Sequence, residues 1–297
     1  AFLLYLFCPY VLLVGAVWGM FDVLSVFFAL LSTYLLDREV FSSILLAVAS
    51  TLKPIPLVLA PLNAILLYKG TARWWRAASY LFRVIVFTAL FTLIPMGVFR
   101  WPISNLYAAL SYHVLANGLA YAYDGAFPYG AASPFNIVDL MARLSGQSIP
   151  LPYPLNFLWI PACLLAYAYA LKHAAKPDFP SVVRWSLLVL LTFFTTRAWV
   201  SDPNLLFAFS YLLICVALHN RAGWRTVHLT WILLSAFILI HVPAISFFWI
   251  SHPWTVSVAT AFCDGPLGWV RLLAMSLLTV AWLAVLWGWL VRRIPAT

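Results

Sequence analysis

The sequence predicts an all-α polytopic membrane protein of about ten spans, including short or broken helices. Of its 297 residues, 65% are hydrophobic, 17% are aromatic and only 8% are charged. A soluble domain is roughly a quarter charged, whereas apolar windows recur here from end to end, many near the ~17–25 residues of a membrane helix. The runs are continuous, unlike the ~10-residue alternating strands of a β-barrel. No linker, low-complexity stretch or repeat divides them, so we expect one integral membrane domain over 1–297.

The net charge of +9 is explained by membrane topology. Lys and Arg fall in short clusters between apolar runs, as the positive-inside rule describes. A basic juxtamembrane surface of this kind faces anionic lipid, so the expected partner is membrane lipid and not nucleic acid. The four cysteines form neither C-x-x-C nor a zinc spacing. The sequence also has no P-loop, dinucleotide fingerprint, H-E-x-x-H motif or cluster of metal ligands. We therefore predict no cofactor, and a divalent metal ion remains an alternative.

The first two spans are expected over 2–17, which Pro9 interrupts, and over 21–36. Residues 41–68 have two interpretations. A single helix would run ~42 Å and would carry Lys53 in its middle. A hairpin that turns at Lys53-Pro54 has arms of only ~18–21 Å, but it keeps the flanking basic clusters on one side of the membrane. Pro54 also disfavours helix at Lys53, so we predict the hairpin.

The hairpin determines whether each later span is expected to cross the membrane outward or inward. We expect both ends of the chain to be cytoplasmic, in the plasma membrane of a prokaryote or the endoplasmic reticulum membrane of a eukaryote. An outer, extracytoplasmic segment is expected over 100–156. The remaining predicted crossings are 79–99, 157–171, 185–196, 205–218, 228–250 and 270–291.

This topology gathers isolated polar residues on the outer face. The positive-inside rule accounts for the basic clusters in the inner loops, but it does not account for Lys53 and Arg197 on the outer side. Isolated charges in a membrane indicate a functional site by default. The outer set is Asp22, Lys53, His113, Asp124, Asp139, Arg197, Asp202, Asn204, His252 and Asp264.

Lys53 and Asp22 each have two interpretations. Lys53 would supply a point charge to a lipid phosphate or diphosphate, or it would extend its amine to the headgroups. Asp22 enters a helix, where a carboxylate suits the helix dipole. It could instead bind a sugar hydroxyl or act as a base.

The run 195–204 is the densest polar stretch between two apolar spans. Arg197 can donate a pair of hydrogen bonds to phosphate oxygens. Trp199 can stack on a sugar or lie in the interfacial aromatic belt. Asp202-Pro203 fits either a site or the start of the next helix, and Asn204 completes the run.

Aromatic residues with few charges mark the outer segment, including Tyr112-His113. Such composition suits carbohydrate or an amphipathic helix on the membrane. His113 fits a structural role as well as a binding role.

Together these motifs resemble the GT-C glycosyltransferases. The nearest likeness is to the catalytic subunit group of GPI mannosyltransferase I and its archaeal and bacterial relatives. It is carried by Gly19-x-x-Asp22 at a helix start, a charged turn, and Lys53-Pro54-x-Pro56 followed by Pro61. Tyr112-His113 and the turn 197–204 look like later motifs of that group.

The resemblance implies transfer of a hexose such as mannose from a polyprenyl- or dolichyl-phosphate donor. The acceptor would be a glycan, lipid or protein outside the cytoplasm, and the reaction would invert the sugar configuration. A carboxylate would act as general base, and Lys53 and Arg197 would stabilise the departing phosphate. Tyr112, His113, Trp199 and Asn204 would help to bind the substrates.

This chain departs from the family pattern in two places. The family's catalytic Asp usually lies in the first outer loop, which would precede Ala1, so we expect an N-terminal portion to be missing. Val114-Leu115-Ala116-Asn117 replaces an Arg-rich continuation. Asp22 and Asp202 then remain as candidate bases. The alternatives are a non-catalytic subunit of the same fold, like the related GPI transamidase subunit, and a lipid transporter or flippase.

Overall fold

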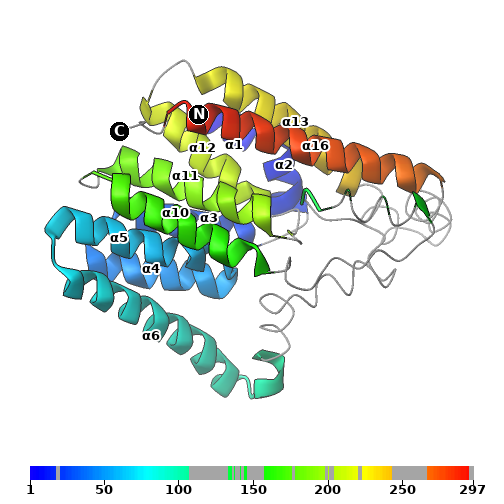
Figure 1. The fold of residues 1–297 in the computed structure, drawn as a ribbon. Coiled ribbons are helices and arrows are strands. Elements are labelled where there is room, and N and C mark those ends of the chain that lie inside the picture. Colours follow the sequence, from blue (N-terminus) through cyan, green and yellow to red (C-terminus); the bar gives the residue numbers. More distant parts are fainter. Residues whose placement is uncertain are drawn as a thin grey trace.

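All regular elements of the described chain are helices (Figure 1). The computed structural model describes residues 1–17, 21–106, 133–135, 137, 141, 144–145, 157–175, 178–197, 200, 204–219, 223–242 and 266–293. Tyr112, His113, Trp199 and Asp202, predicted as site residues, lie outside the described residues, as does most of the predicted outer segment 100–156.

The helices follow one another with short connections in the first third of the chain. They are α1 (Phe2–Leu6), α2 (Pro9–Leu12), the π-helix η1 (Leu13–Val17), α3 (Asp22–Tyr34), α4 (Glu39–Leu52), the 3₁₀ helix η2 (Ile55–Val58), α5 (Leu59–Thr71) and α6 (Trp74–Val98). The later helices are α10 (Trp159–His173), α11 (Phe179–Thr196), α12 (Leu205–His219), α13 (Trp224–Val242) and α16 (Pro266–Val291).

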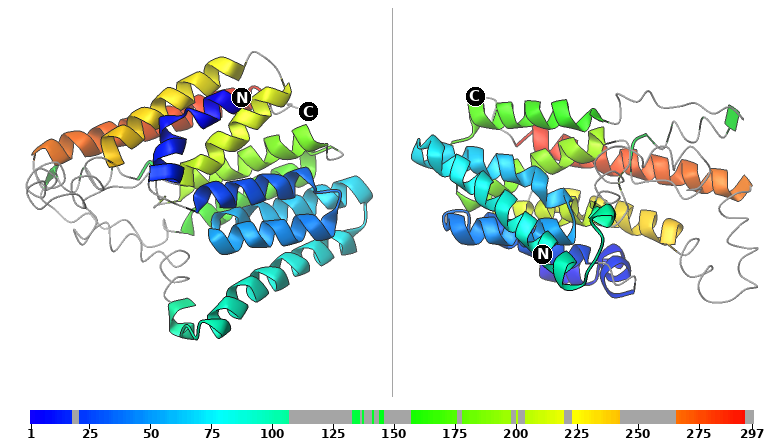
Figure 2. Two further views of the ribbon diagram at one scale, coloured as in Figure 1. Left: turned by 180° about the vertical axis from the view of Figure 1, so that it is seen from behind. Right: turned by 90° about the horizontal axis from the view of Figure 1, so that it is seen from below.

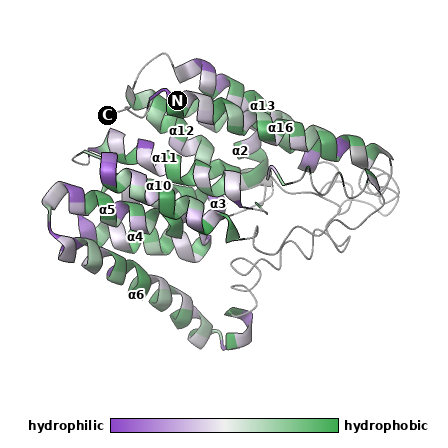
Figure 3. Cartoon of the chain, viewed as in Figure 1, coloured by the Kyte–Doolittle hydropathy of each residue, from purple (hydrophilic) through white to green (hydrophobic). Residues whose placement is uncertain are grey.

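Four of these helices are long and apolar enough to cross a membrane: Trp74–Val98, Phe179–Thr196, Trp224–His241 and Val270–Val291. This composition is compatible with an integral membrane protein. Apolar residues cover α6 and α16 along most of their lengths, and hydrophilic residues gather where α5 turns into α6 (Figure 3). The shorter apolar helices are Asp22–Tyr34, Glu39–Leu52, Ile55–Thr71 and Leu205–Leu218.

The larger helices lie side by side in a bundle, and the two views of Figure 2 show the same grouping. Helix α3 packs on α4 and α4 on α6, while α10 packs on α11 and α11 on α12. Helices α13 and α16 form a further pair. Helix α11 is the most enclosed of the four long helices, because 67% of its apolar window is buried.

The predicted hairpin at Lys53 is confirmed. Helix α4 ends at Leu52, and Lys53 is extended (φ −149°, ψ 133°), as expected for a residue that precedes proline. Glu39, at the start of α4, contacts Arg76 and Arg83 on α6. Because α6 follows α5 directly, these ion pairs show that α5 returns to the end of the bundle where α4 began.

Two predicted spans differ in extent from the helices observed. The first span, predicted over 2–17, is divided into α1, α2 and η1, since Pro9 cannot donate the hydrogen bond that a continuous helix needs. Helix α11 begins at Phe179 and not at 185. Its start is set by Asp178, whose side chain accepts a hydrogen bond from the Ser181 N–H at 2.9 Å, an N-cap interaction.

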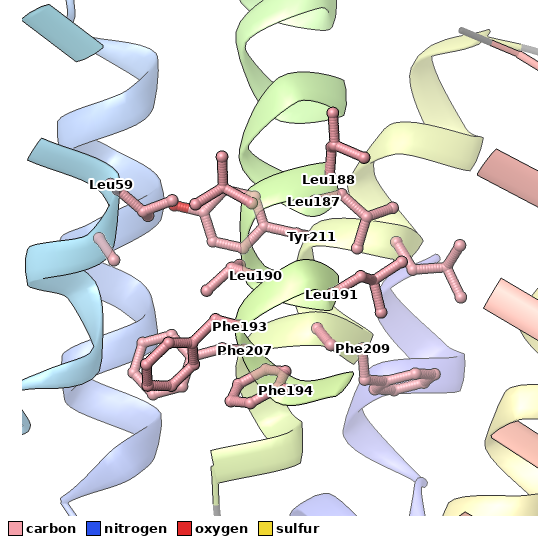
Figure 4. Packing of buried hydrophobic residues seen from close by; sticks show 14 of the residues in the cluster. Leu59, Leu187, Leu188, Leu190, Leu191, Phe193, Phe194, Phe207, Phe209 and Tyr211 are labelled. Carbon is pink, nitrogen blue, oxygen red and sulfur yellow. The ribbon is translucent and has the colours of Figure 1, made fainter. Parts of the chain in front are cut away.

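Leucines and aromatic residues of α11 and α12 fill the centre of the bundle (Figure 4). Leu187, Leu190 and Phe194 of α11 are fully buried, as are Phe207 and Tyr211 of α12. This packing fixes the position of the C-terminal end of α11, from which Arg197 extends.

Candidate functional site

An ion pair joins two of the predicted site residues. Asp22 Oδ2 lies 3.3 Å from Lys53 Nζ, and the two side chains are 0% and 26% exposed, respectively. Asp22 occupies the first turn of α3, and Lys53 caps the C-terminus of α4. Each charge therefore lies at the helix end whose dipole favours it. This arrangement supports the helix-dipole interpretation of Asp22 and gives Lys53 a fixed counter-ion.

Backbone contacts explain why residues far apart in sequence meet here. The carbonyl oxygen of Ala49 accepts a hydrogen bond from the Lys53 N–H at 3.0 Å and from the Ser25 hydroxyl at 2.7 Å. Ser25 lies one turn after Asp22 on α3. The shared carbonyl thus holds the start of α3 beside the end of α4, and it brings the two charges together.

A cavity of about 490 Å³ opens beside Lys53. We refer to it as the Lys53 cavity. Its described lining has two cations, Lys53 and Arg197, and the amide of Asn204, while most of its other residues are apolar. The full lining comprises Lys53, Pro54, Ile55, Leu57, Val58, Pro61, Trp159, Ile160, Cys163, Leu164, Tyr167, Phe193, Arg197 and Asn204.

Arg197 lies one residue beyond α11, and its guanidinium lies over an aromatic ring. Its guanidinium carbon lies 5.1 Å from the centroid of the Phe193 ring, and Phe193 meets Trp159 edge to face at 5.4 Å. Burial lowers the pKa of Arg197 to about 10, so the side chain is still a cation at neutral pH. The aromatic surroundings favour such a cation through their ring faces.

Two hydrogen bonds fix the backbone around the cations. Tyr167 on α10 donates its hydroxyl hydrogen to the Val58 carbonyl at 2.6 Å, which ties α10 to the 3₁₀ turn after Lys53. Ser133 donates to the Arg197 carbonyl at 2.9 Å and is fully buried. Part of the predicted outer segment therefore contacts the residue that supplies the second cation.

The structure brings four of the predicted site residues to one end of the bundle. Lys53, Arg197 and Asn204 line the cavity, whereas Asp22 lies behind Lys53 and does not. Sequence reasoning missed Trp159 and Tyr167, because an aromatic residue in an apolar helix carries no signal of its position.

This geometry suits an amphiphilic anion. Two cations can hold a phosphate, and the apolar walls formed by η2 and α10 suit a hydrocarbon chain. Among the described residues, no group of three or more His, Cys, Asp or Glu side chains could hold a metal ion. In comparisons with family models, curated proteins and solved structures, nothing matched this chain.

Proposed function

We propose that the protein is a membrane glycosyltransferase that moves a sugar from a polyprenyl- or dolichyl-phosphate donor to a lipid, glycan or protein acceptor. The observation that carries the proposal is the pairing of Lys53 and Arg197 in one apolar cavity. A lipid-phosphate donor has the same two properties, a charged phosphate and a long hydrocarbon chain. The resemblance to GT-C enzymes supplies the reaction, and the cavity is consistent with its leaving group.

Each cation has a distinct part in the proposal. When the sugar leaves, negative charge builds up on the phosphate, and fixed cations in a site that excludes water stabilise that charge strongly. Lys53 acts as a point charge whose position is set by Asp22, while Arg197 donates in a planar, forked geometry. Asn204 offers an amide to the same space.

Two carboxylates of this chain, Asp22 and Asp202, are candidates for the general base. Asp22 is fully buried and lies 3.3 Å from Lys53, which favours a positioning role for its carboxylate. Asp202 then stands as the better candidate for the base within this chain, next to Asn204 in sequence. Tyr112, His113 and Trp199 keep their proposed roles in binding sugar or acceptor.

The proposed topology places the Lys53 cavity at the extracytoplasmic face. About ten crossings, with the shorter helices counted, would put the basic clusters and both chain ends in the cytoplasm, as the positive-inside rule favours. The donor lipid would then enter from the outer leaflet.

Sugar transfer from a radiolabelled polyprenyl-phosphate donor tests the proposal, in membranes that carry the full-length protein. We expect Lys53→Ala and Arg197→Ala each to lower the rate by about 100-fold, as loss of one charge-stabilising donor does in other active sites. Lys69→Ala is the matched control, because Lys69 lies at the other end of α5 and does not line the cavity. It should keep the rate unchanged.

Full-length protein that is folded but transfers no sugar from any donor tested would contradict the enzyme proposal. If it still bound polyprenyl phosphate through Lys53 and Arg197, the non-catalytic subunit would replace the enzyme as the interpretation.

A further inference from the structure

A second cavity, of about 680 Å³, lies at the opposite end of the bundle. We call it the Arg38 cavity. It is formed where the α3–α4 turn meets the end of α5, the start of α6 and the start of α11. Its lining consists of Thr33, Tyr34, Leu35, Leu36, Asp37, Arg38, Leu67, Gly70, Thr71, Arg76, Asp178, Phe179 and Val182.

The charged lining of this cavity is balanced. Two cations, Arg38 and Arg76, and two carboxylates, Asp37 and Asp178, are among the lining residues. Arg76 is already paired with Glu39, and Asp178 caps α11. Within the described part of the chain, neither Asp37 nor Arg38 forms an ion pair. Both side chains are exposed, so each can contact a ligand.

Apolar and aromatic side chains form most of the remaining wall, beside Thr33, Gly70 and Thr71. Tyr34 and Phe179 meet edge to face with ring centroids 5.2 Å apart, and Tyr34 is 60% exposed. Leu67 and Val182 come from α5 and α11. The cavity therefore offers an apolar surface next to opposite charges, at a helix end where Lys69 and Arg73 also lie.

We propose that the Arg38 cavity binds the head group of a membrane phospholipid that has both a phosphate and a primary ammonium. The phosphate would contact Arg38, and the ammonium would contact Asp37, with Asp178 nearby. A ligand with only negative or only positive charge is disfavoured here, because it would lie next to two lining residues of the same sign. A primary ammonium has three N–H donors, which a quaternary ammonium lacks. This proposal is independent of the sugar-transfer reaction.

Native mass spectrometry of the delipidated full-length protein in detergent tests the proposal. The probes are phosphatidylethanolamine, phosphatidylcholine, phosphatidylglycerol and free phosphoethanolamine. We expect phosphatidylethanolamine to be retained best. Arg38→Gln should weaken its retention about tenfold, since a charge-assisted hydrogen bond contributes roughly one such factor. Asp37→Asn should shift the preference toward phosphatidylglycerol, because the carboxylate that opposes a pure anion is gone.

Arg73→Gln is the matched control, since Arg73 lies near the same helix ends but not in the cavity lining. It should leave retention unchanged. Equal retention of the three lipids, or unchanged preference in both Arg38→Gln and Asp37→Asn, would overturn the proposal. Retention of free phosphoethanolamine as tight as that of the lipid would overturn the lipid assignment in favour of a soluble ligand.

Discussion

The two ends of the bundle carry cavities of different charge. The Lys53 cavity has two cations and mostly apolar walls, whereas the Arg38 cavity has two cations and two carboxylates. Under the proposed topology, the arginines near the α4 start belong to the cytoplasmic basic clusters that the positive-inside rule predicts. The same proposed topology does not account for Lys53 and Arg197 at the other end. Cations that topology does not require are the better indicators of a site.

The ion pairs at the two ends differ in burial. Asp22 is 0% exposed and has Lys53 as its cation. Glu39 is 12% exposed and is shared by Arg76 and Arg83, which are 31% and 23% exposed. The first pair lies beside a mostly apolar cavity and has a fully buried carboxylate, whereas the second links α4 to α6 through a carboxylate that keeps some exposure. The two pairs should therefore respond differently to substitution.

The largest expected loss of stability comes from Lys53→Met, which leaves the buried Asp22 carboxylate without its lysine. Breaking a buried pair on one side costs about 3 kcal/mol or more. Thermal unfolding in detergent should show this loss. The double variant Asp22→Asn/Lys53→Met should recover most of it, because the buried carboxylate charge is removed as well. Equal stability of Lys53→Met and the wild type would contradict the buried pair.

Glu39→Gln should cost less, about 1 kcal/mol, because partly exposed pairs are screened by water. The same unfolding assay measures it, and added salt should shrink the difference from wild type. If Glu39→Gln lowers the unfolding stability as much as Lys53→Met does, the proposed difference between the two ion pairs is contradicted.

Tyr167→Phe removes the hydroxyl that ties α10 to the turn after Lys53. We expect a loss of about 1 kcal/mol of stability, the usual contribution of one hydrogen bond. The affinity for polyprenyl phosphate should fall a few-fold, since Lys53 is less firmly placed. Tyr169→Phe is the control on the same helix, because Tyr169 does not line the cavity. Identical behaviour of the two variants would remove the positioning role from Tyr167.

Ser133→Ala has the smallest expected effect, about 0.5 kcal/mol. It deletes the hydrogen bond to the Arg197 carbonyl but leaves the guanidinium in place. Phosphate affinity should fall less than in Tyr167→Phe, and the exposed Ser104→Ala serves as its control. A larger effect than that of Tyr167→Phe would mean that the predicted outer segment controls the site more than α10 does.

The sequence was sufficient to predict the helical class, the hairpin and the shared location of Lys53, Arg197 and Asn204. Pro54 indicates the turn after Lys53. Lys53 and Arg197 stand out because the positive-inside rule does not account for cations on the outer side. These signals depend on residue type and on charge counting, so they do not require knowledge of packing.

Other features depend on tertiary contacts that sequence patterns do not encode. The pairing of Asp22 with Lys53 follows from α3 packing against α4 through Ser25 and Ala49. The contribution of Tyr167 depends on which face of α10 meets η2. The Arg38 cavity combines residues of four helices and the α3–α4 turn, and each of its charges looks like an ordinary solvated turn residue in the sequence.

Binding of radiolabelled polyprenyl phosphate to the purified full-length protein tests the central claim most directly, because it needs neither acceptor nor sugar. We predict saturable binding that Lys53→Ala and Arg197→Ala each weaken by about tenfold or more, while Lys69→Ala retains wild-type affinity. Equal affinity in all four proteins, or no binding to the wild type, would contradict the assignment of the Lys53 cavity to a lipid phosphate.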